Sequence, residues 1–330
     1  MQGISKISKK MMGWSAFIMT ALLSTGAMAQ PTGAVLPQQI KIVVPFPPGG
    51  SNDIFARVLA QKLAARTGSL VIVDNKPGAG GAIGAEFVMR AAADGATLML
   101  TSSSFATGAA VQKKLPFDPI KGFSPVAMLA SGPMIVAVGN DTPYKTTAQL
   151  IDAARASKGK LNYGSAGIGS INHLSTELLG SMAKTEMTHI PYKGMGPAVT
   201  DLIGGQIQVL VASFPSIMSH IKAGKIRALA VTSTARSKFA PDMPTVSAAV
   251  PDYSVTLWWG IFAPPGMAQP LLDRLNSEIR AVTASSEMRE VFEKEGADSA
   301  AMTAGEFAAF VRSDIEKWRS VARERNIAAD

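Results

Sequence analysis

The sequence predicts an α/β fold made of two lobes that hold a small anionic molecule between them. Residues 40–53 and 161–173 each consist of an apolar run, a glycine-rich turn and the start of a helix pattern. A helix that begins after glycines presents free backbone N–H groups at the positive end of its dipole, where an anion can bind. In addition, 330 residues exceed what one hydrophobic core usually serves, so two domains are expected.

The first part of the chain alternates strand and helix patterns. A strand over 40–46 leads to a helix over 53–66, whose apolar side includes Val58 and Leu59 and which ends at the glycine C-cap Gly68. Strands separated by helices of this length predict parallel βαβ units. The elements that follow are a buried strand 71–73, a turn 76–81, a helix 82–92, a strand 97–100 and a loop 115–119.

A second α/β unit follows Gly132 and Pro133, which lie between two apolar runs and are interpreted as a crossing between lobes. We predict a discontinuous first domain, 30–131 and 254–330, a second domain, 132–253, and a hinge made of two connections. The second domain is expected to contain helices 148–156, 170–182, 198–203 and 216–223, strands 161–164, 209–211 and 229–231, and a strand and turn over 188–194; the segments 255–262, 270–282 and 304–325 return to the first.

The N-terminus has the pattern of a secretory signal peptide over residues 1–29. Lys6, Lys9 and Lys10 form a positive region, residues 11–23 are mostly apolar, and residues 27–29 read A-x-A. The apolar run is too short for a comfortable membrane span. We therefore expect a periplasmic protein that starts at Gln30, and the absence of cysteine excludes a lipoprotein anchor.

Composition excludes several classes of function. The chain has no cysteine, so it has no thiolate metal site, iron–sulfur cluster or disulfide. His173, His189 and His220 lie far apart in sequence without paired-ligand spacing, although folding could bring two of them together, so no metal is expected. The net charge of +8 falls to +5 without the three lysines of the signal, and no basic run interleaved with aromatics indicates nucleic acid.

The motifs favour binding over catalysis. Residues 78–84 do not match G-x-G-x-x-G, and no nucleotide-binding P-loop pattern occurs, so that turn is interpreted as close packing of a helix and no cofactor is expected. There is no G-x-S-x-G elbow. Ser165 and Ser170 lie near His173 in sequence, but a triad depends on geometry, and Ser170 is better explained as a helix N-cap. No catalytic residue is assigned.

Two further features lie where ligands bind in open α/β sheets. The hydroxyl run 101–104 follows a strand, so its side chains can donate to a carboxylate or bond the local backbone, and both interpretations stay open. Asp53, close behind Gly49 and Gly50, would repel an anion. It is assigned a structural role or a role toward an ammonium group.

From about residue 38 to the C-terminus, the chain carries a specific combination of short motifs. Taken jointly, they resemble the Bug-type family, the periplasmic substrate-binding proteins of tripartite tricarboxylate transporters. The segments that carry the resemblance are 44–57, 73–81, 113–119, 163–173, 190–194, 205–206, 215–216 and 220–230.

The resemblance implies a two-lobed periplasmic-binding-protein fold of the Venus-flytrap, type II-like, kind, with the cleft between two βαβ domains. It implies a small carboxylate ligand held by opposed helix starts and by water, and no catalysis. The candidate ligand-binding residues that it indicates are Phe46, Gly49, Gly50, Ser51, Thr101, Ser102, Ser103, Tyr163, Gly164, Ser165, Gly167, Gly169, Ser170, His173, Pro191, Tyr192, Lys193, Gly194, Ala212 and Ser213.

One position departs from the family pattern. Many relatives have an acid after the strand 209–211 that can hold a ligand's ammonium group, but this chain has Ala212, Ser213 and Phe214 there. A carboxylate without an amine, with an aliphatic or aromatic body, is therefore favoured. The expected partners are this ligand and membrane permease subunits, and the protein is expected to be a monomer. A ligand-sensing receptor for a membrane signalling protein, or an enzyme on the same scaffold, are the alternatives.

Overall fold

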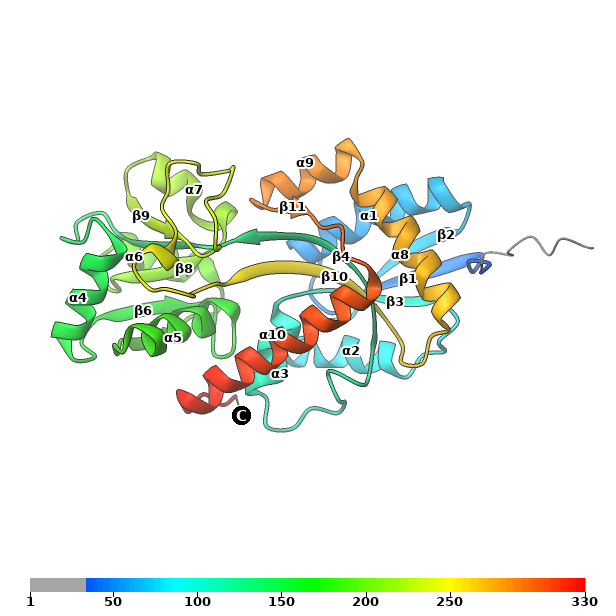
Figure 1. Ribbon diagram of the computed structural model, residues 1–330, viewed down its shortest axis with the longest axis horizontal. Helices are drawn as coiled ribbons and strands as arrows, with labels where there is room; N and C mark the ends of the chain where they lie inside the picture. Colours follow the sequence, from blue (N-terminus) through cyan, green and yellow to red (C-terminus); the bar gives the residue numbers. More distant parts are fainter. Residues whose placement is uncertain (1–33, 330) are drawn as a thin grey trace, which may run out of the picture. The chain divides into compact units, whose positions relative to one another are not determined.

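Two mixed β-sheets surrounded by helices form the described part of the chain, residues 34–329 of the computed structural model (Figure 1). Residues 33–330 belong to a single unit by their contacts. The predicted signal peptide and its cleavage site lie outside the described residues.

The first sheet has the strand order β11-β4-β10-β3-β1-β2. β1 pairs in parallel with β2 and β3, as the sequence predicts, but β10 is antiparallel to both β3 and β4. The sequence predicts that the segment 255–262 returns to this domain but not its direction, and β10 is antiparallel because it comes back from the second sheet. The bounds are β1 Gln39–Val44, β2 Leu70–Asn75, β3 Thr97–Ser102, β4 Ser124–Pro133, β10 Thr256–Ala263 and β11 Asp298–Ser299.

Helices cover both faces of the first sheet. On one face, Phe55 and Leu59 of α1 pack in a buried cluster with Ile279 of α8 and Phe292 of α9. On the other face, α2, α3 and α10 contribute the buried Val88, Ala106 and Phe307, so helices bury both faces of the sheet. The bounds are α1 Ser51–Thr67, α2 Ala82–Met89, α3 Ser104–Val111, α8 Gln269–Thr283, α9 Ser286–Lys294 and α10 Ala304–Glu324, with short 3₁₀ turns at Ala79–Gly81 and Val246–Ala248.

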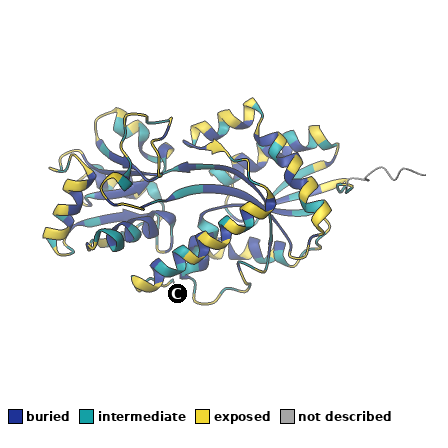
Figure 2. Ribbon diagram, viewed as in Figure 1, coloured by how far each residue is buried: buried dark blue, intermediate teal, exposed yellow. Residues whose placement is uncertain are grey.

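The second sheet has the order β7-β6-β8-β5-β9. β6 is parallel to β7 and β8, whereas β5 is antiparallel to β8 and β9. Both sheets are thus mixed, and Figure 2 shows their strands as the buried centre of each half. The bounds are β5 Ile135–Gly139, β6 Asn162–Ser165, β7 Thr188–Pro191, β8 Val209–Ala212, β9 Ile226–Val231, α4 Thr147–Ser157, α5 Ile171–Ala183, α6 Met195–Ile203 and α7 Phe214–Lys222.

Two connections join the sheets, and one threonine links them. Only Met134 separates β4 from β5, and residues 232–255 return from β9 to β10. The buried Thr232 accepts a hydrogen bond from the Met134 backbone N–H through its hydroxyl oxygen, 2.7 Å away, and donates to the Val255 carbonyl at 2.8 Å. The crossing strands lie side by side in Figure 1. A bend at either connection therefore has to accommodate the other.

The helix α10 ties the two halves together. A capping box at Thr303 and Glu306 starts it, and Asp314 in its middle accepts a hydrogen bond from the Trp258 indole of β10 at 2.9 Å. Just beyond its end, Arg325 donates to Glu177 of α5 at 2.6 Å. The helix therefore contacts the first sheet through its body, and its C-terminal end is tied to α5 of the second half.

Candidate ligand-binding cleft

A cleft of about 920 Å³ lies between the two halves of the described unit. This volume is within the range of sites for small molecules. The segments 79–86 and 104–116 supply one wall, and the loop 166–170 supplies the opposite one. The lining residues are Phe46, Ala79, Gly80, Ala82, Ile83, Glu86, Ser104, Gly108, Val111, Gln112, Lys113, Lys114, Pro116, Ala166, Ile168, Gly169, Ser170 and Ala329.

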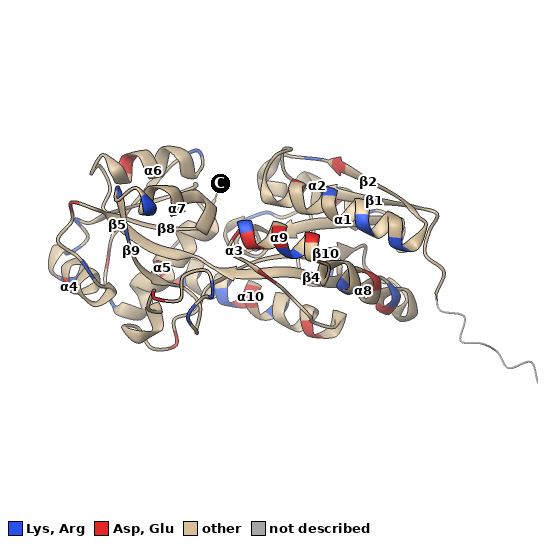
Figure 3. Ribbon diagram, turned by 90° about the horizontal axis from the view of Figure 1, so that it is seen from above, with Lys and Arg blue, Asp and Glu red and all other residues tan. Residues whose placement is uncertain are grey.

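The cleft has a positive balance of charge. Lys113 and Lys114 line it, and among the described residues its one acidic lining residue, Glu86, is paired at 2.5 Å with Arg90, which follows α2. Much of the remaining charge lies on α1, α8, α9 and α10 (Figure 3). The positive end of α5 also faces the cleft, because its N-cap Ser170 is a lining residue. This arrangement favours an anionic ligand.

The first glycine turn is exposed to solvent and is held by a buried carboxylate, Asp53. A Cβ atom at Gly49 or Gly50 would meet nothing within 4 Å, and both residues are exposed. The buried Asp53 accepts a hydrogen bond from the Gly49 backbone N–H at 3.0 Å and pairs with Arg57 at 2.9 Å. The hydrogen bond from Arg57 holds the pKa of Asp53 below its usual value. This carboxylate therefore has the structural role that the sequence allowed, fixing the turn.

Ser51, the first residue of α1, contacts a carboxylate from the other end of the chain. Its hydroxyl donates to Glu295 at 2.9 Å, just after α9. Burial raises the pKa of Glu295. None of Gly49, Gly50 and Ser51 lines the cleft, whereas Phe46, at the start of the same loop, does.

The hydroxyl run 101–104 splits between two environments. Thr101 and Ser104 line an apolar recess beside the cleft, and Ser104 also lines the cleft itself. The Ser102 and Ser104 hydroxyls bond each other at 2.9 Å. Ser103 is fully buried at the start of α3, and its hydroxyl has no hydrogen-bond partner among the described residues. The bond of Ser102 is therefore to a side chain and not to the local backbone.

The second glycine turn is built on two stacked histidines. The rings of His173 and His189 lie 3.8 Å apart at an interplanar angle of 10°. Nδ1 of His173 accepts the Gly169 backbone N–H at 3.2 Å, and Nε2 of His189 lies 2.6 Å from the Ser165 hydroxyl. Burial lowers the pKa of each histidine to about 4, so both rings are neutral at pH 7 and hold the loop.

The remaining residues of this loop are engaged inside the protein. Tyr163 is fully buried and donates its hydroxyl to Glu177 at 2.5 Å, and burial raises its pKa. Gly164 is buried where a Cβ would lie 2.5 Å from Ile207. Gly167 has φ +126°, a conformation that glycine adopts readily. Only Gly169 and Ser170 of the predicted loop residues line the cleft, together with Ala166 and the exposed Ile168.

The turn after β7 and the end of β8 lie outside the cleft lining. Tyr192 donates its backbone N–H to the Ser165 carbonyl at 3.1 Å and its hydroxyl to Asp201 at 2.6 Å, and burial raises its pKa to about 12. The residues beside it, Pro191 and Lys193, are exposed, while Gly194 starts α6 at φ +109°. Ala212 is fully buried in the apolar core of the second sheet, and the Ser213 hydroxyl bonds Ser216 at 2.8 Å.

The structure therefore brings Phe46, Thr101, Gly169 and Ser170 of the predicted residues to the cleft and its recess. Sequence reasoning selected Ser104 within the run 101–104, but it did not select the segments 79–86 and 108–116 as ligand-binding. The turn 78–84 was explained by close packing of a helix, and Gly84 has this role, because a Cβ there would lie 2.8 Å from Pro45. Gly78, Ala79, Gly80 and Gly81 instead all have positive φ.

The Ser165–His189 pair does not form a hydrolase site. Ser165 is fully buried, and its hydroxyl also contacts the carbonyl oxygen and the N–H of Gly167, both at 3.1 Å. A nucleophile must reach its substrate, which this hydroxyl cannot. Among the described residues no group of three His, Cys, Asp or Glu side chains could hold a metal ion, and no helix is long and apolar enough to cross a bilayer.

Two sheets joined by two crossing segments, with a positively charged cleft walled from both halves, define the class of solute-binding proteins. The family model of the tripartite tricarboxylate transporter family receptor matches residues 55–327, and this chain belongs to that family. It is 34% identical over 307 residues to protein BugT of Bordetella pertussis, which covers 92% of this chain and 94% of BugT.

Solved structures of relatives share the fold. The Rpa4515 protein of R. palustris, solved with adipate, is 32% identical with a TM-score of 0.75, over 88% of this chain and 98% of that one. MatC of Rhodopseudomonas palustris, solved with bound malate, is 30% identical with a TM-score of 0.72, over 86% and 98% respectively.

Proposed function

We propose that this protein is a periplasmic receptor that captures a small organic carboxylate in the cleft and delivers it to the membrane subunits of a tripartite transporter. The observation that carries the proposal is the cleft itself, with Lys113, Lys114 and the start of α5 around it. Family membership supports it, as do the adipate and malate in two relatives. In this proposal the protein acts as a monomer and catalyses no reaction.

The two halves give this receptor its mechanism. Residues 30–131 with 254–330, and residues 132–253, are proposed to move as two lobes about Met134 and Thr232. The ligand docks on one lobe, and closure then adds donors from the other and excludes water. Two exposed isoleucines support this motion, because Ile83 and Ile168 line opposite walls and are each 54% exposed. Closure would remove both from water. Residues 1–29 are proposed as the export signal.

A panel of carboxylates tests the proposal. A ligand that binds the folded state raises stability by about 2.7 kcal/mol at a hundredfold excess over its Kd. We therefore expect the order of affinities of succinate, adipate, malate and aspartate from calorimetry to agree with the order of their thermal shifts. Aspartate should bind more weakly than succinate, because an unpaired ammonium group is costly to desolvate. Absence of any shift at millimolar concentrations of all members would contradict a carboxylate receptor.

A further inference from the structure

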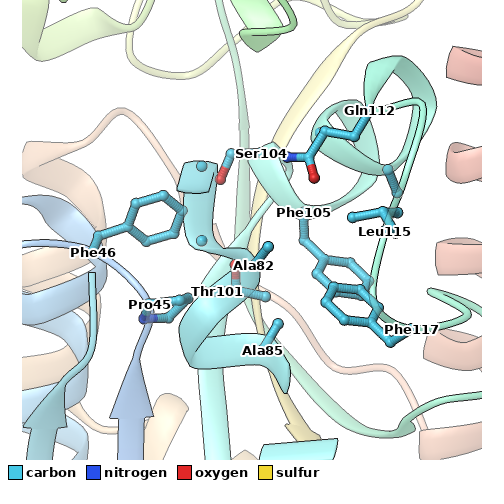
Figure 4. Close-up of a pocket in the computed structure, with 14 residues that line it drawn as sticks. Pro45, Phe46, Ala82, Ala85, Thr101, Ser104, Phe105, Gln112, Leu115 and Phe117 are labelled. Atoms are coloured by element: carbon cyan, nitrogen blue, oxygen red, sulfur yellow. The ribbon is translucent and has the colours of Figure 1, made fainter. Parts of the chain in front are cut away.

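An apolar recess opens off the cleft on the side of the first sheet (Figure 4). Phe46, Gly80, Ala82, Ser104, Gly108 and Gln112 line both spaces, so the two lie side by side. The residues that line only the recess are Pro45, Gly81, Ala85, Thr101, Phe105, Ala109, Leu115 and Phe117.

The recess differs from the cleft in charge. No side chain that lines it is charged, and its polar groups are limited to Thr101, Ser104 and Gln112. Thr101 is buried, and Ser104 is already bonded to Ser102. An ionised group placed there would lose its hydration without meeting a charged side chain. An apolar group has no such hydration to lose.

The far wall of the recess is made of aromatic rings that pack on the buried core. Phe105 stacks on Phe117 with ring centroids 6.3 Å apart and an angle of 3°. Phe105 also packs against Phe123 at 5.4 Å and Phe262 at 5.2 Å, which belong to the buried core. In Figure 4, Phe46 stands across from these rings, with Ala82 and Thr101 between them. Phe105 and Phe117 therefore present apolar ring surface to a group in the recess.

The size of the recess limits what it can hold. Its volume is about 20 Å³, enough for one group of the size of a water molecule or a methyl group. We propose that the recess takes the apolar end of the carboxylate bound in the cleft, so that this receptor selects alkyl carboxylates over dicarboxylates of equal length. This inference rests on the proposed function and adds a substrate class to it.

The matched pair hexanoate and adipate tests the inference, because the two acids differ only in a terminal methyl or carboxylate group. We expect hexanoate to bind more tightly in calorimetry. Along the series from propanoate to octanoate, the methylene that enters the recess should strengthen binding by about fourfold, with no gain from longer chains. Tighter binding of adipate would overturn the inference and leave the proposed function intact, whereas binding of neither series would count against both.

Two variants assign the selectivity to the recess. Leu115 is half-buried and lines only the recess, so Leu115→Ala should enlarge the recess. In this variant the affinity should continue to rise up to a longer chain length of the acid than in the wild type. Ala109→Leu should fill the recess and remove about fourfold from hexanoate affinity while leaving propanoate unchanged. Lys225→Ala, on an exposed residue outside the cleft and recess, is the control. An identical chain-length profile in wild type and Leu115→Ala would overturn the inference, even if Ala109→Leu failed to fold.

Discussion

Replacing Gly169 with alanine tests the contact that joins the two halves beside the cleft. Gly169 precedes α5 with φ +78°, and a Cβ there would lie 2.4 Å from Cγ2 of Val111, at the end of α3. Two carbons pack at about 3.5–4.0 Å, so Val111 or the loop has to move. The left-handed backbone costs alanine about 1–2 kcal/mol, and overpacking adds about 1–3 kcal/mol. Gly169→Ala should therefore destabilise the protein by about 2–5 kcal/mol.

Gly205 provides the matched control, because it has φ +75° and nothing lies within 4 Å of a Cβ there. Gly205→Ala should show only the backbone cost of about 1–2 kcal/mol. The measurement is urea unfolding of both variants, with Gly169→Ala repeated in a Val111→Ala background, where the excess should shrink. Equal losses for Gly169→Ala and Gly205→Ala would refute the packing argument. So would an excess that persists without the valine methyl groups.

Three further predictions concern the stacked histidines of the second half and the ion pairs that join the halves. The pKa of about 4 for His173 and His189 in the folded protein lies below the value of about 6.5 in the unfolded chain. Their contribution to the free energy of unfolding is therefore complete above pH 6.5 and is lost as the pH falls toward 4. The loss is about 1.4 kcal/mol per pH unit for each histidine. Urea midpoints at pH 7 and 5 measure this, and a His189→Asn variant with the same pH slope would contradict it. Arg325→Met leaves the buried Glu177 carboxylate without its countercharge and should lower the stability measured by thermal unfolding by about 3–5 kcal/mol. The double variant Glu177→Gln, Arg325→Met should lose less stability, because it has no unpaired carboxylate. Equal losses for the single and the double variant would argue against the ion pair. Lys238 bridges to Asp298 and Glu293 on the surface, so Lys238→Met should cost less than about 1 kcal/mol, and a larger loss in chemical denaturation would show a stronger link between the halves.

Local patterns in the sequence identified most elements but not their directions. The helix α1 and the capped helix α10 have strong periodicity and end signals, and both lie within two residues of their predicted bounds. The antiparallel β10 was not predicted, because strand direction depends on where the chain returns from rather than on the residues of the strand. The helix α3 was missed since its sequence, SFATGAAV, consists largely of small residues without an apolar period.

The cleft was only partly predictable for a similar reason. The two glycine turns mark backbone that approaches the cleft, yet the residues that line it include ordinary ones such as Ala82 and Gln112. Their position depends on how α2 and α3 pack on the first sheet. The stacking of His173 on His189 likewise requires α5 and β7 to meet, which sequence separation hides. Ala212 remains a prediction as a ligand contact, although its side chain is buried in the second sheet.

Mass spectrometry of the small molecules released from gently purified protein would show whether the cleft holds an organic carboxylate. The comparison is with Gly108→Leu, because Gly108 lies in α3, lines both cleft and recess, and has only Gln112 at 3.7 Å from a Cβ. A leucine there fits the helix and occupies the site. We expect the wild type to release an organic acid with a carboxylate and an apolar end. We expect Gly108→Leu to be equally stable and to release none. A ligand without a carboxylate, or the same acid retained in equal amount by Gly108→Leu, would contradict it.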